Sequence, residues 1–166
     1  YRESNVVTNY KIRKGDVDAG FRTSKVIIES EYWTPVQEHA YLQPEAGIAY
    51  MDDQGRITVK VAGHWTHEDQ EQIAHSLGLE ENQIRVIYPA IGGAFGGRED
   101  MSVQIVLALA AWRLHQRGIN RPVKIIWSRE ESIIGHHKPH AYYFKTPWGA
   151  DENGVLAAAE VELVAD

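Results

Sequence analysis

Four glycines around one phenylalanine place the strongest constraint on how this chain folds. The stretch Ile91-Gly-Gly-Ala-Phe-Gly-Gly-Arg-Glu-Asp100 has glycine at four of the six positions from 92 to 97. The apolar run before it, 84–91, predicts a strand, and the run after it, 100–114, predicts a buried helix. At such a junction backbone N–H groups are unpaired and the positive end of a helix dipole is close. Glycine also lets a ligand lie against the backbone without meeting a Cβ.

The spacing of these glycines does not identify a ligand. The pattern G-G-x-F-G-G matches neither the dinucleotide fingerprint G-x-G-x-x-G nor the phosphate-binding P-loop. A glycine-rich turn without any ligand is the alternative, because glycine is common in turns of every kind. If the junction binds something, an anion or a polar cofactor atom suits it best.

Composition excludes several classes of partner. The 166 residues are enough for one domain with a core, and the net charge of −6 argues against nucleic acid and anionic membranes. The chain has no cysteine, so it forms no disulfide and supplies no thiolate to an iron–sulfur cluster. That absence is compatible with a cytoplasmic protein. The longest apolar run, 105–112, is much shorter than the ~20 residues that span a bilayer.

Hydrophobic periodicity predicts one α+β domain over residues 1–166, with a mixed sheet and two main helices packed on it. An irregular arm is predicted over 1–20. The predicted strands are 25–33, 47–51, 56–62, 84–91, 121–127, 141–148 and 155–164. The predicted helices are 66–78, with Thr66 as N-cap, and 100–114, and 128–135 predicts a short helical turn. Because 101–114 is apolar nearly all round, we expect that helix to be covered on most sides.

Two charged residues follow predicted strands. Glu99 comes after the glycine loop, and Arg129 comes after the strand that ends at Trp127. Strand ends of this kind tend to meet at one edge of a sheet, so this acceptor and this donor could face one small planar ligand. Each also has a structural explanation. Glu99 would be favoured by the dipole of a following helix by about 0.3–1 kcal/mol, and Arg129 by a surface ion pair with a neighbouring glutamate.

The eight histidines raise the question of a metal site. His64 and His67 precede the first long helix, and three more stand in the segment Gly135-His-His-Lys-Pro-His140. Zinc needs three or four convergent ligands, and the chain has neither H-E-x-x-H nor a thiolate. Solvated or hydrogen-bonded histidines are therefore the favoured interpretation, and a histidine-based metal hydrolase is a less favoured alternative.

Three motifs occur in order along the chain. They are Glu38-His-Ala-Tyr-Leu-Gln-Pro-Glu45, the glycine loop with Arg98-Glu99, and Arg121-Pro-Val-Lys followed by Ser128-Arg-Glu-Glu and Gly135-His-His-Lys-Pro-His140. Together they closely resemble the molybdenum-binding subunit of the xanthine dehydrogenase/aldehyde oxidase family of molybdenum hydroxylases, from about residue 20 onward. The resemblance implies a molybdenum cofactor-binding domain-like fold and the first molybdopterin-binding segment of a larger catalytic subunit.

The resemblance also implies a reaction. In that family the glycine loop lies against the molybdenum centre, so Gly93, Ala94, Phe95 and Gly96 would approach the oxygen and sulfur ligands of the metal. The metal would be held through the pterin and not by a side chain of this segment. The reaction implied is hydroxylation of an electron-poor carbon, with water as the source of oxygen.

Substrate choice is implied by Glu99 and Arg129, whose positions carry the same acid and arginine in purine-oxidising members. Glu99 would bond a ring nitrogen, and Arg129 would stabilise charge on a ring oxygen. We therefore expect a purine-type N-heterocycle resembling xanthine or hypoxanthine. His64 stands where purine-type relatives have a glutamine that bonds the molybdenum oxo group. It could donate one N–H, and its charge could vary near neutral pH.

Other parts of the enzyme are implied to lie elsewhere. These are the general base, most pterin contacts, the iron–sulfur clusters and the flavin (FAD), and the pterin is either molybdopterin or its cytosine dinucleotide form. We expect this segment alone to be inactive and the parent enzyme to be cytoplasmic. A non-catalytic interaction or assembly domain that kept the fold is the alternative, supported by His64 in place of glutamine.

Overall fold

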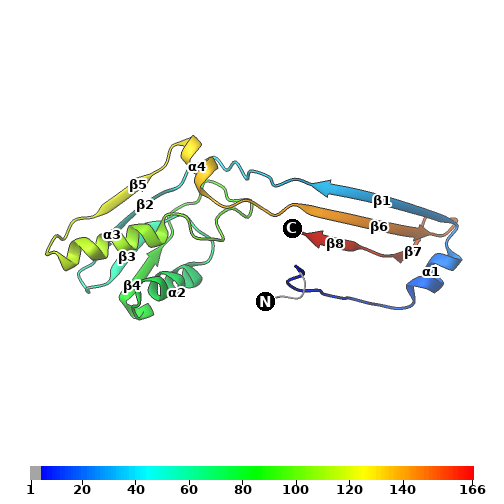
Figure 1. Ribbon diagram of the computed structural model, residues 1–166, viewed down its shortest axis with the longest axis horizontal. Helices are drawn as coiled ribbons and strands as arrows, with labels where there is room; N and C mark the ends of the chain where they lie inside the picture. The colour runs from blue at the N-terminus through cyan, green and yellow to red at the C-terminus, as the bar shows by residue number, and fades with distance from the viewer. Residues whose placement is uncertain (1–4) are drawn as a thin grey trace. The chain divides into compact units, whose positions relative to one another are not determined.

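The computed structural model describes residues 5–166, which pack into two compact units (Figure 1). One unit consists of the residues up to Pro35 together with His140–Asp166, and the other is Val36–Pro139. The single domain over 1–166 stays a prediction. The two units arise because β1 (Val26–Thr34) pairs with β6 (Tyr142–Ala150) in a sheet that is separate from the sheet of the other unit.

The unit Val36–Pro139 contains a mixed sheet, as the predicted α+β fold class requires. Its strands are β2 (Ala46–Met51), β3 (Ile57–Val61), β4 (Ile84–Ile87) and β5 (Val123–Ile126), in the order β4-β3-β2-β5. β2 is antiparallel to both β3 and β5, whereas β3 and β4 are parallel. β2 and β3 form the predicted hairpin. The 3₁₀ turn η1 (Glu81–Gln83) leads into β4.

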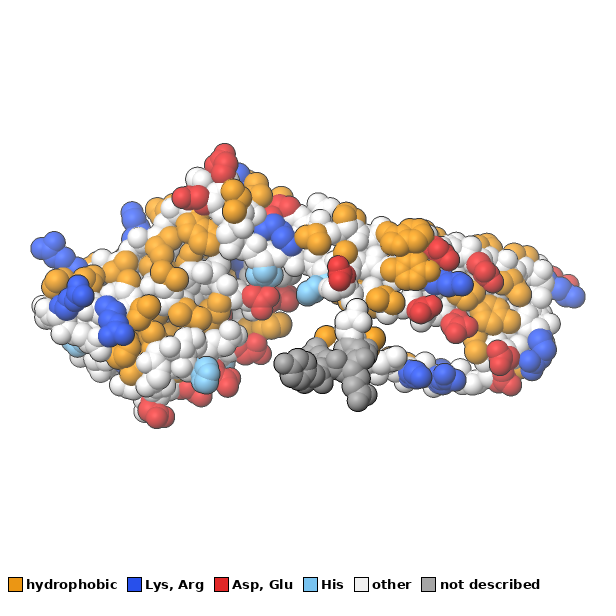
Figure 2. Space-filling view, viewed as in Figure 1, with side chains coloured by type: hydrophobic (Ala, Val, Ile, Leu, Met, Phe, Trp, Pro, Cys, Tyr) orange, Lys and Arg blue, Asp and Glu red, His pale blue; other side chains and the backbone are white. Residues whose placement is uncertain are grey.

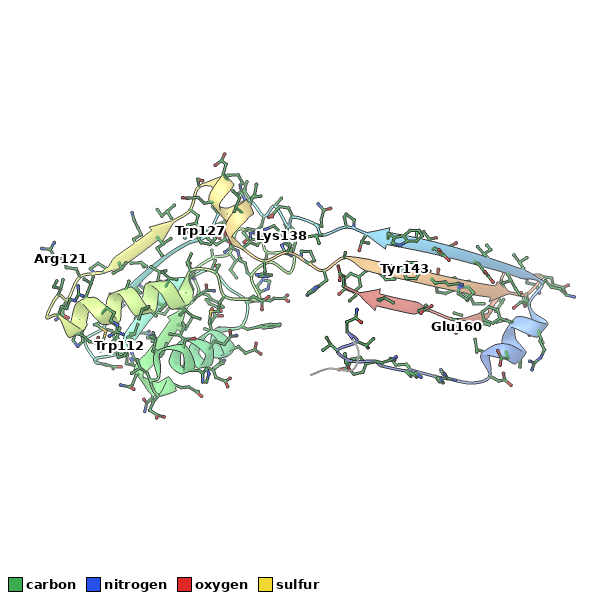
Figure 3. All side chains as sticks on the ribbon, in the orientation of Figure 1. Trp112, Arg121, Trp127, Lys138, Tyr143 and Glu160 are labelled. Atoms are coloured by element: carbon green, nitrogen blue, oxygen red, sulfur yellow. The ribbon has the colours of Figure 1, made fainter. Side chains whose placement is uncertain are left out.

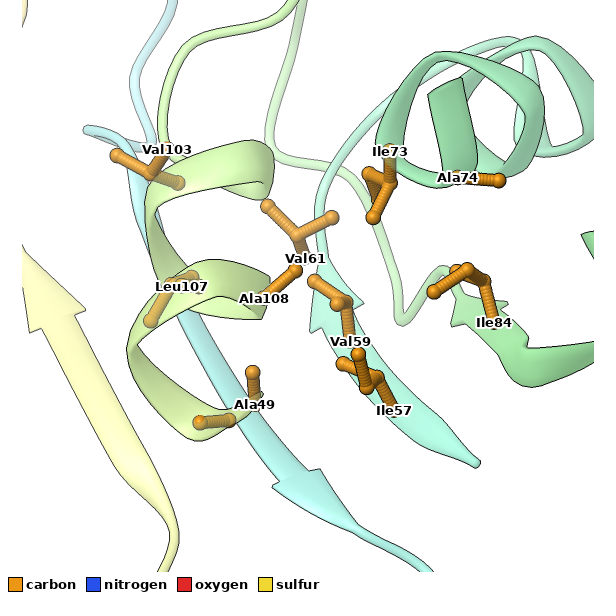
Figure 4. Close-up of a cluster of buried hydrophobic side chains, with 11 residues drawn as sticks. Ala49, Ile57, Val59, Val61, Ile73, Ala74, Ile84, Val103, Leu107 and Ala108 are labelled. Carbon is orange, nitrogen blue, oxygen red and sulfur yellow. The ribbon is translucent and has the colours of Figure 1, made fainter. Parts of the chain in front are cut away.

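Helices α2 (Thr66–Leu77) and α3 (Gln104–Gln116) cover this sheet and enclose one hydrophobic core (Figure 4). The fully buried core residues are Ala49, Ile57, Val59, Val61, Ile73, Ala74, Ile84, Val103, Leu107, Ala108 and Ala111. α3 approaches β2 so closely that a Cβ on Gly47 would lie 2.7 Å from Leu107 Cδ1. Gly47, the second residue of β2, therefore allows the helix to pack close to the strand.

The predicted helix 100–114 begins later than expected, at Gln104, and β4 ends at Ile87 and not at 91. Pro89 lacks the N–H that a continuing strand would need. The Gln104 side chain accepts a hydrogen bond from Ser102 N at 2.8 Å at the start of the helix. Residues 88–103, between β4 and α3, form one long loop. Glu99 lies five residues before α3, so the predicted stabilisation of Glu99 and of the glycine loop by the dipole of this helix is wrong.

Two other helix predictions are corrected. The N-cap of α2 is Trp65 and not Thr66, and no side chain within the described residues caps this end. α3 is not covered on most sides, since Val106 is 56% exposed and Leu109 is 39% exposed. Only the stripe that contains Leu107, Ala108 and Ala111 faces the sheet and α2.

The second unit is an antiparallel sheet with one short helix. α1 (Val17–Thr23) is capped by Asp16, and β6 pairs with β1, β7 (Leu156–Ala159) and β8 (Glu162–Ala165). The predicted arm 1–20 is irregular only over 5–16, and residues 1–4 lie outside the described residues. The single strand predicted over 155–164 is interrupted where Glu160 N bonds Pro147 O at 3.0 Å.

Large hydrophobic side chains remain at the surface of this sheet (Figure 2). Tyr143 on β6, labelled in Figure 3, packs against Trp33 of β1 with ring centroids 5.3 Å apart, yet Trp33 is still 67% exposed. Within residues 5–166, no helix is both long and apolar enough to cross a membrane.

The buried carboxyl of Asp69 on α2 links this helix to α3 and to Tyr88, which follows β4. Tyr88 donates its hydroxyl hydrogen to Asp69 Oδ2 at 2.6 Å, and Gln104 Nε2 lies 3.4 Å from the same oxygen. Burial raises the pKa of Asp69, although the hydrogen bonds from Tyr88 and Gln104 act to lower it. Burial also raises the pKa of Tyr88, with the Asp69 bond acting in the same direction, so Tyr88 remains the donor.

We expect Asp69 to make unfolding dependent on pH. Because the pKa of Asp69 is higher in the folded chain, its stabilising contribution is present below the unfolded value of about 3.9 and is lost as pH rises through the folded value. Asp69→Asn should remove this decline when the free energy of unfolding is measured in urea from acid to neutral pH. The control Asp53→Asn, in the exposed turn before β3, should keep it. An identical pH profile for both variants would contradict the assignment.

Candidate cofactor site at one edge of the mixed sheet

The direction of the strands brings four connecting segments to one edge of the β4-β3-β2-β5 sheet. Because β3 and β4 are parallel and β2 is antiparallel to both β3 and β5, the carboxyl ends of β3, β4 and β5 lie at the edge where β2 begins. The segments at that edge are 36–45, 62–65, 88–103 and the start of α4 (Arg129–Gly135). Every site residue predicted from the sequence belongs to one of them, as convergence of strand ends requires.

The glycine loop is a left-handed turn that presents Phe95 to solvent. Gly93 has φ +99°, Phe95 +53° and Gly96 +87°, and Gly97 N bonds Ala94 O at 2.9 Å. Phe95 is 77% exposed, whereas Ala94 is buried. A positive φ at a non-glycine residue costs about 1–3 kcal/mol and is concentrated at functional sites. Among the hydrogen bonds of residues 5–166, none uses the backbone N–H of Gly93, Phe95 or Gly96.

The two outer glycines have a different purpose. A Cβ on Gly97 would lie 2.8 Å from His39 Nδ1, and one on Gly92 would lie 2.6 Å from Gln43 Cβ. Gln43 also pairs with the loop through its side chain, because Gly92 N donates to Gln43 Oε1 at 2.8 Å. At these positions the close neighbour is the chain's own segment 38–45 and not an external ligand.

Arg98 fastens the loop from inside. Its side chain is 3% exposed and lies over the Tyr41 ring, with 4.2 Å from the guanidinium carbon to the ring centroid. Its Nε donates to Gly93 O at 3.0 Å, its Nη2 donates to Gln43 O, and its Nη1 lies 3.8 Å from Glu45 Oε1. The guanidinium therefore ties the glycine loop to the segment 38–45 at three points.

Glu45 is the buried acceptor at the centre of this edge. It is 1% exposed, and its two carboxylate oxygens accept hydrogen bonds from the hydroxyls of Tyr41 and Ser132. Burial raises the pKa of Tyr41, and the bond to Glu45 raises it further, so this hydroxyl stays protonated and donates. Sequence reasoning missed both Arg98 and Glu45 as buried residues, although both stand in the quoted motifs. Charged residues in glycine- and proline-containing stretches give no sign of burial.

The structure brings His64 and Glu99 together. His64 N bonds Arg98 O at 3.2 Å, which places the segment after β3 beside the glycine loop. His64 Nδ1 then lies 3.9 Å from Glu99 Oε1, and both side chains are partly exposed, at 38% and 41%. The imidazole and the carboxylate thus stand next to each other on the accessible side of the loop.

Arg129 is held at the same edge but by different contacts. The Ser128 hydroxyl accepts from Glu131 N at 3.1 Å and Glu131 Oε2 accepts from Ser128 N at 2.8 Å, which forms a capping box at the start of α4. Arg129 Nη2 donates to Leu42 O at 2.6 Å, so its hydrogen-bond partner lies in the segment 38–45. Among residues 5–166, no hydrogen bond or ion pair joins Arg129 to Glu99.

The family model described as Molybdopterin cofactor-binding domain matches residues 1–166. The chain belongs to this family. The described residues fit such a cofactor, because a strained, exposed turn with unpaired N–H groups is a suitable contact for electronegative ligand atoms.

Similar proteins are molybdenum hydroxylases and their subunits. The Nicotinate dehydrogenase large molybdopterin subunit of Eubacterium barkeri is 34% identical over 164 residues, which cover 99% of this chain and 37% of that protein. The Xanthine dehydrogenase/oxidase of Rattus norvegicus is 34% identical over 154 residues, which cover 91% of this chain and 11% of that protein. This chain therefore spans about a third of the length of the first relative and about a tenth of the length of the second.

The fold is shared with a solved structure, the aldehyde oxidoreductase from Desulfovibrio gigas. The TM-score is 0.79 at 24% identity, over 92% of this chain and 16% of that chain. At this identity the likeness establishes the fold only. It confirms the predicted molybdenum cofactor-binding domain-like architecture.

We expect the buried Arg98–Glu45 network to set the stability of the loop edge. Arg98→Met leaves Glu45 without its cation, and breaking a buried ion pair from one side costs about 3–5 kcal/mol. The free energy of unfolding in urea measures this loss. Arg85→Met, which removes an exposed arginine from β4, is the matched control and should change stability by less than about 0.5 kcal/mol. Equal effects of the two changes would show that Arg98 has no special part in stability.

Proposed function

We propose that this chain is the molybdopterin-binding portion of a molybdenum hydroxylase that oxidises a purine-type N-heterocycle, such as xanthine or hypoxanthine, with water as the source of oxygen. The observation that carries the proposal is the gathering of the glycine loop, His64, Glu99 and Arg129 at one edge of the sheet. An acceptor, an imidazole and a guanidinium thus lie at the same sheet edge as an exposed turn, in a chain of the molybdopterin-binding domain family.

The backbone of Gly93, Ala94, Phe95 and Gly96 would contact the cofactor. Their turn has N–H groups that no described residue accepts from, and Phe95 within it is 77% exposed. When bound, the molybdenum cofactor supplies the redox chemistry of the hydroxylation. His64 would donate one ring N–H toward the same side, in the place where purine-type relatives have glutamine.

Glu99 and Arg129 would orient the substrate. The Glu99 carboxylate can accept a hydrogen bond from a ring N–H. Arg129 uses Nη2 for Leu42 O, and its other N–H groups are available to a ring oxygen. Negative charge that grows on that oxygen in the transition state would be stabilised by the guanidinium.

The charges of Glu99 and Arg129 discriminate between two candidate substrates, a purine and an anionic pyridine carboxylate. The relative from Eubacterium barkeri is named for nicotinate and the one from Rattus norvegicus for xanthine. An anionic carboxylate would pair with Arg129 and be repelled by Glu99, whereas a purine with ring N–H and carbonyl groups would use both side chains. The presence of Glu99 beside the loop therefore favours the purine.

The remaining parts of the enzyme would come from other segments. We expect later molybdopterin-binding segments to supply the general base and most pterin contacts, and separate domains or subunits to supply iron–sulfur clusters and FAD. The cofactor would be molybdopterin or its cytosine dinucleotide form, and the enzyme would work in the cytoplasm. We expect no turnover from residues 1–166 alone.

Arg129→Met in the full-length protein should lower purine turnover by about 10²–10³-fold, because a preorganised donor to the developing oxyanion is lost. Molybdenum content, measured by elemental analysis of the same preparations, should stay unchanged. Arg121→Met, which removes an exposed arginine just before β5, is the matched control and should keep turnover. A parallel loss of turnover and molybdenum in Arg129→Met would assign the residue a structural role.

Elemental analysis of the unmodified full-length protein tests the proposal as a whole. About one molybdenum per chain is expected, together with turnover of xanthine or hypoxanthine that exceeds turnover of nicotinate. A well-folded protein without molybdenum would instead favour an interaction or assembly domain that kept the fold. Molybdenum with nicotinate as the better substrate would retain the hydroxylase and overturn only the purine.

A further inference from the structure

A second side-chain cluster lies in the unit Val36–Pro139, where the segment 38–45 meets the residues after α4. Glu38 Oε1 and His39 Nδ1 each lie 3.3 Å from His136 Nε2. One ligand atom from each of the three residues falls within 4.8 Å of the other two. The His136 side chain is 1% exposed, so the nitrogen at the centre of the cluster is shielded from solvent.

The hydrogen bond on the far side of His136 decides what this nitrogen can do. His136 Nδ1 bonds the carbonyl oxygen of Ser132, which can only accept, so Nδ1 carries a proton. In the neutral ring Nε2 then has a lone pair, directed toward the Glu38 carboxylate and the His39 ring. A ring N–H bonded to a backbone carbonyl, with the other nitrogen facing a carboxylate and a second imidazole, is how histidine ligands of metals are usually oriented.

Two of the three donor–donor distances in the cluster match those of a metal site. In a tetrahedral site with metal–ligand bonds of about 2.0–2.1 Å, neighbouring donor atoms lie about 3.3–3.4 Å apart. Both distances to His136 Nε2 are 3.3 Å, beyond the usual range of about 2.7–3.2 Å for N–H···O bonds. We propose that Glu38, His39 and His136 bind one divalent transition-metal ion of the zinc type, with the fourth position open to water.

Lys138, labelled in Figure 3, supports this arrangement and limits its strength. Its Nζ lies 2.9 Å from Glu38 Oε2 and donates to His136 O at 2.7 Å. Glu38 Oε1 accepts one hydrogen bond, from Ala40 N at 3.1 Å, and its second lone pair is left for the metal. Its positive charge opposes a second cation nearby, so we expect binding weaker than at a closed structural zinc site. Imidazole and carboxylate donors suit Zn²⁺ and its neighbours and disfavour Mg²⁺.

Such an ion would join two segments that also hold the candidate cofactor site. Glu38 and His39 begin the segment that contacts the glycine loop and Arg129, and His136 ends α4, which begins with Arg129. The ion would thus hold these two segments together. The inference does not depend on the proposed reaction.

The test is titration of the full-length protein with Zn²⁺ after removal of loosely held metal with a chelator. Calorimetry should find one Zn²⁺ per chain, and Glu38→Gln and His39→Ala should each weaken binding at least tenfold. His140→Ala, which removes an exposed histidine from the same motif, is the matched control and should bind as the unaltered protein does. Mg²⁺ should give no comparable heat.

The same samples separate this inference from the molybdenum assignment. Molybdenum is quantified in each preparation, so a missing cofactor would overturn the proposed function and leave the Zn²⁺ result to be judged by itself. Because His136 is buried and its removal would disturb packing, the comparison uses Glu38 and His39. Absence of Zn²⁺ binding, or binding that is equal in Glu38→Gln, His39→Ala and His140→Ala, would overturn the metal site and leave a hydrogen-bonded imidazole cluster.

Discussion

The candidate site depends on one buried carboxylate, that of Glu45. Its oxygens are bonded by the hydroxyls of Tyr41 and Ser132, and Arg98 lies beside it as the compensating cation. A buried carboxylate without such partners would be strongly unfavourable, so burial of Glu45 requires all three to be in place together. Those partners belong to the segment before β2, the glycine loop and α4. Because burying Glu45 without these partners is so unfavourable, the three segments must come together when the edge folds.

Strand direction explains why that edge exists. In a sheet ordered β4-β3-β2-β5, three strands point toward the edge and β2 points away from it. The chain consequently reaches the same edge four times, once before β2 and once after each of the other strands. Residues as distant in sequence as Leu42 and Arg129, or His64 and Arg98, are brought into hydrogen-bonding contact there. The helices on the sheet bury its apolar side, so the polar residues of the connections are left for chemistry.

Periodicity predicted the elements of the fold because burial on one side leaves a regular trace in sequence. The hairpin of β2 and β3, the helix α2 and the short helix α4 follow that trace closely. The start of α3 does not, because an apolar run cannot reveal that the Gln104 side chain ends the preceding loop. The sequence could not predict the burial of Arg98 and Glu45 either, because their partners are distant along the chain. Arg98 bonds Gln43, and Glu45 bonds Ser132, and each pair is more than forty residues apart. The division of the chain into two units depends likewise on the pairing of strands that are distant in sequence, such as β1 and β6.

The glycine loop shows how one motif can satisfy two physical demands. Gly92 and Gly97 are required by the closeness of Gln43 and His39, whereas Gly93 and Gly96 are required by positive φ. The outer pair thus fastens the loop to the protein, and the inner pair shapes the turn that exposes Phe95. A loop that is clamped at both ends and strained in the middle has little freedom to rearrange when a ligand binds. Preorganisation of this kind is what a site needs if backbone N–H groups are to meet a cofactor at fixed positions.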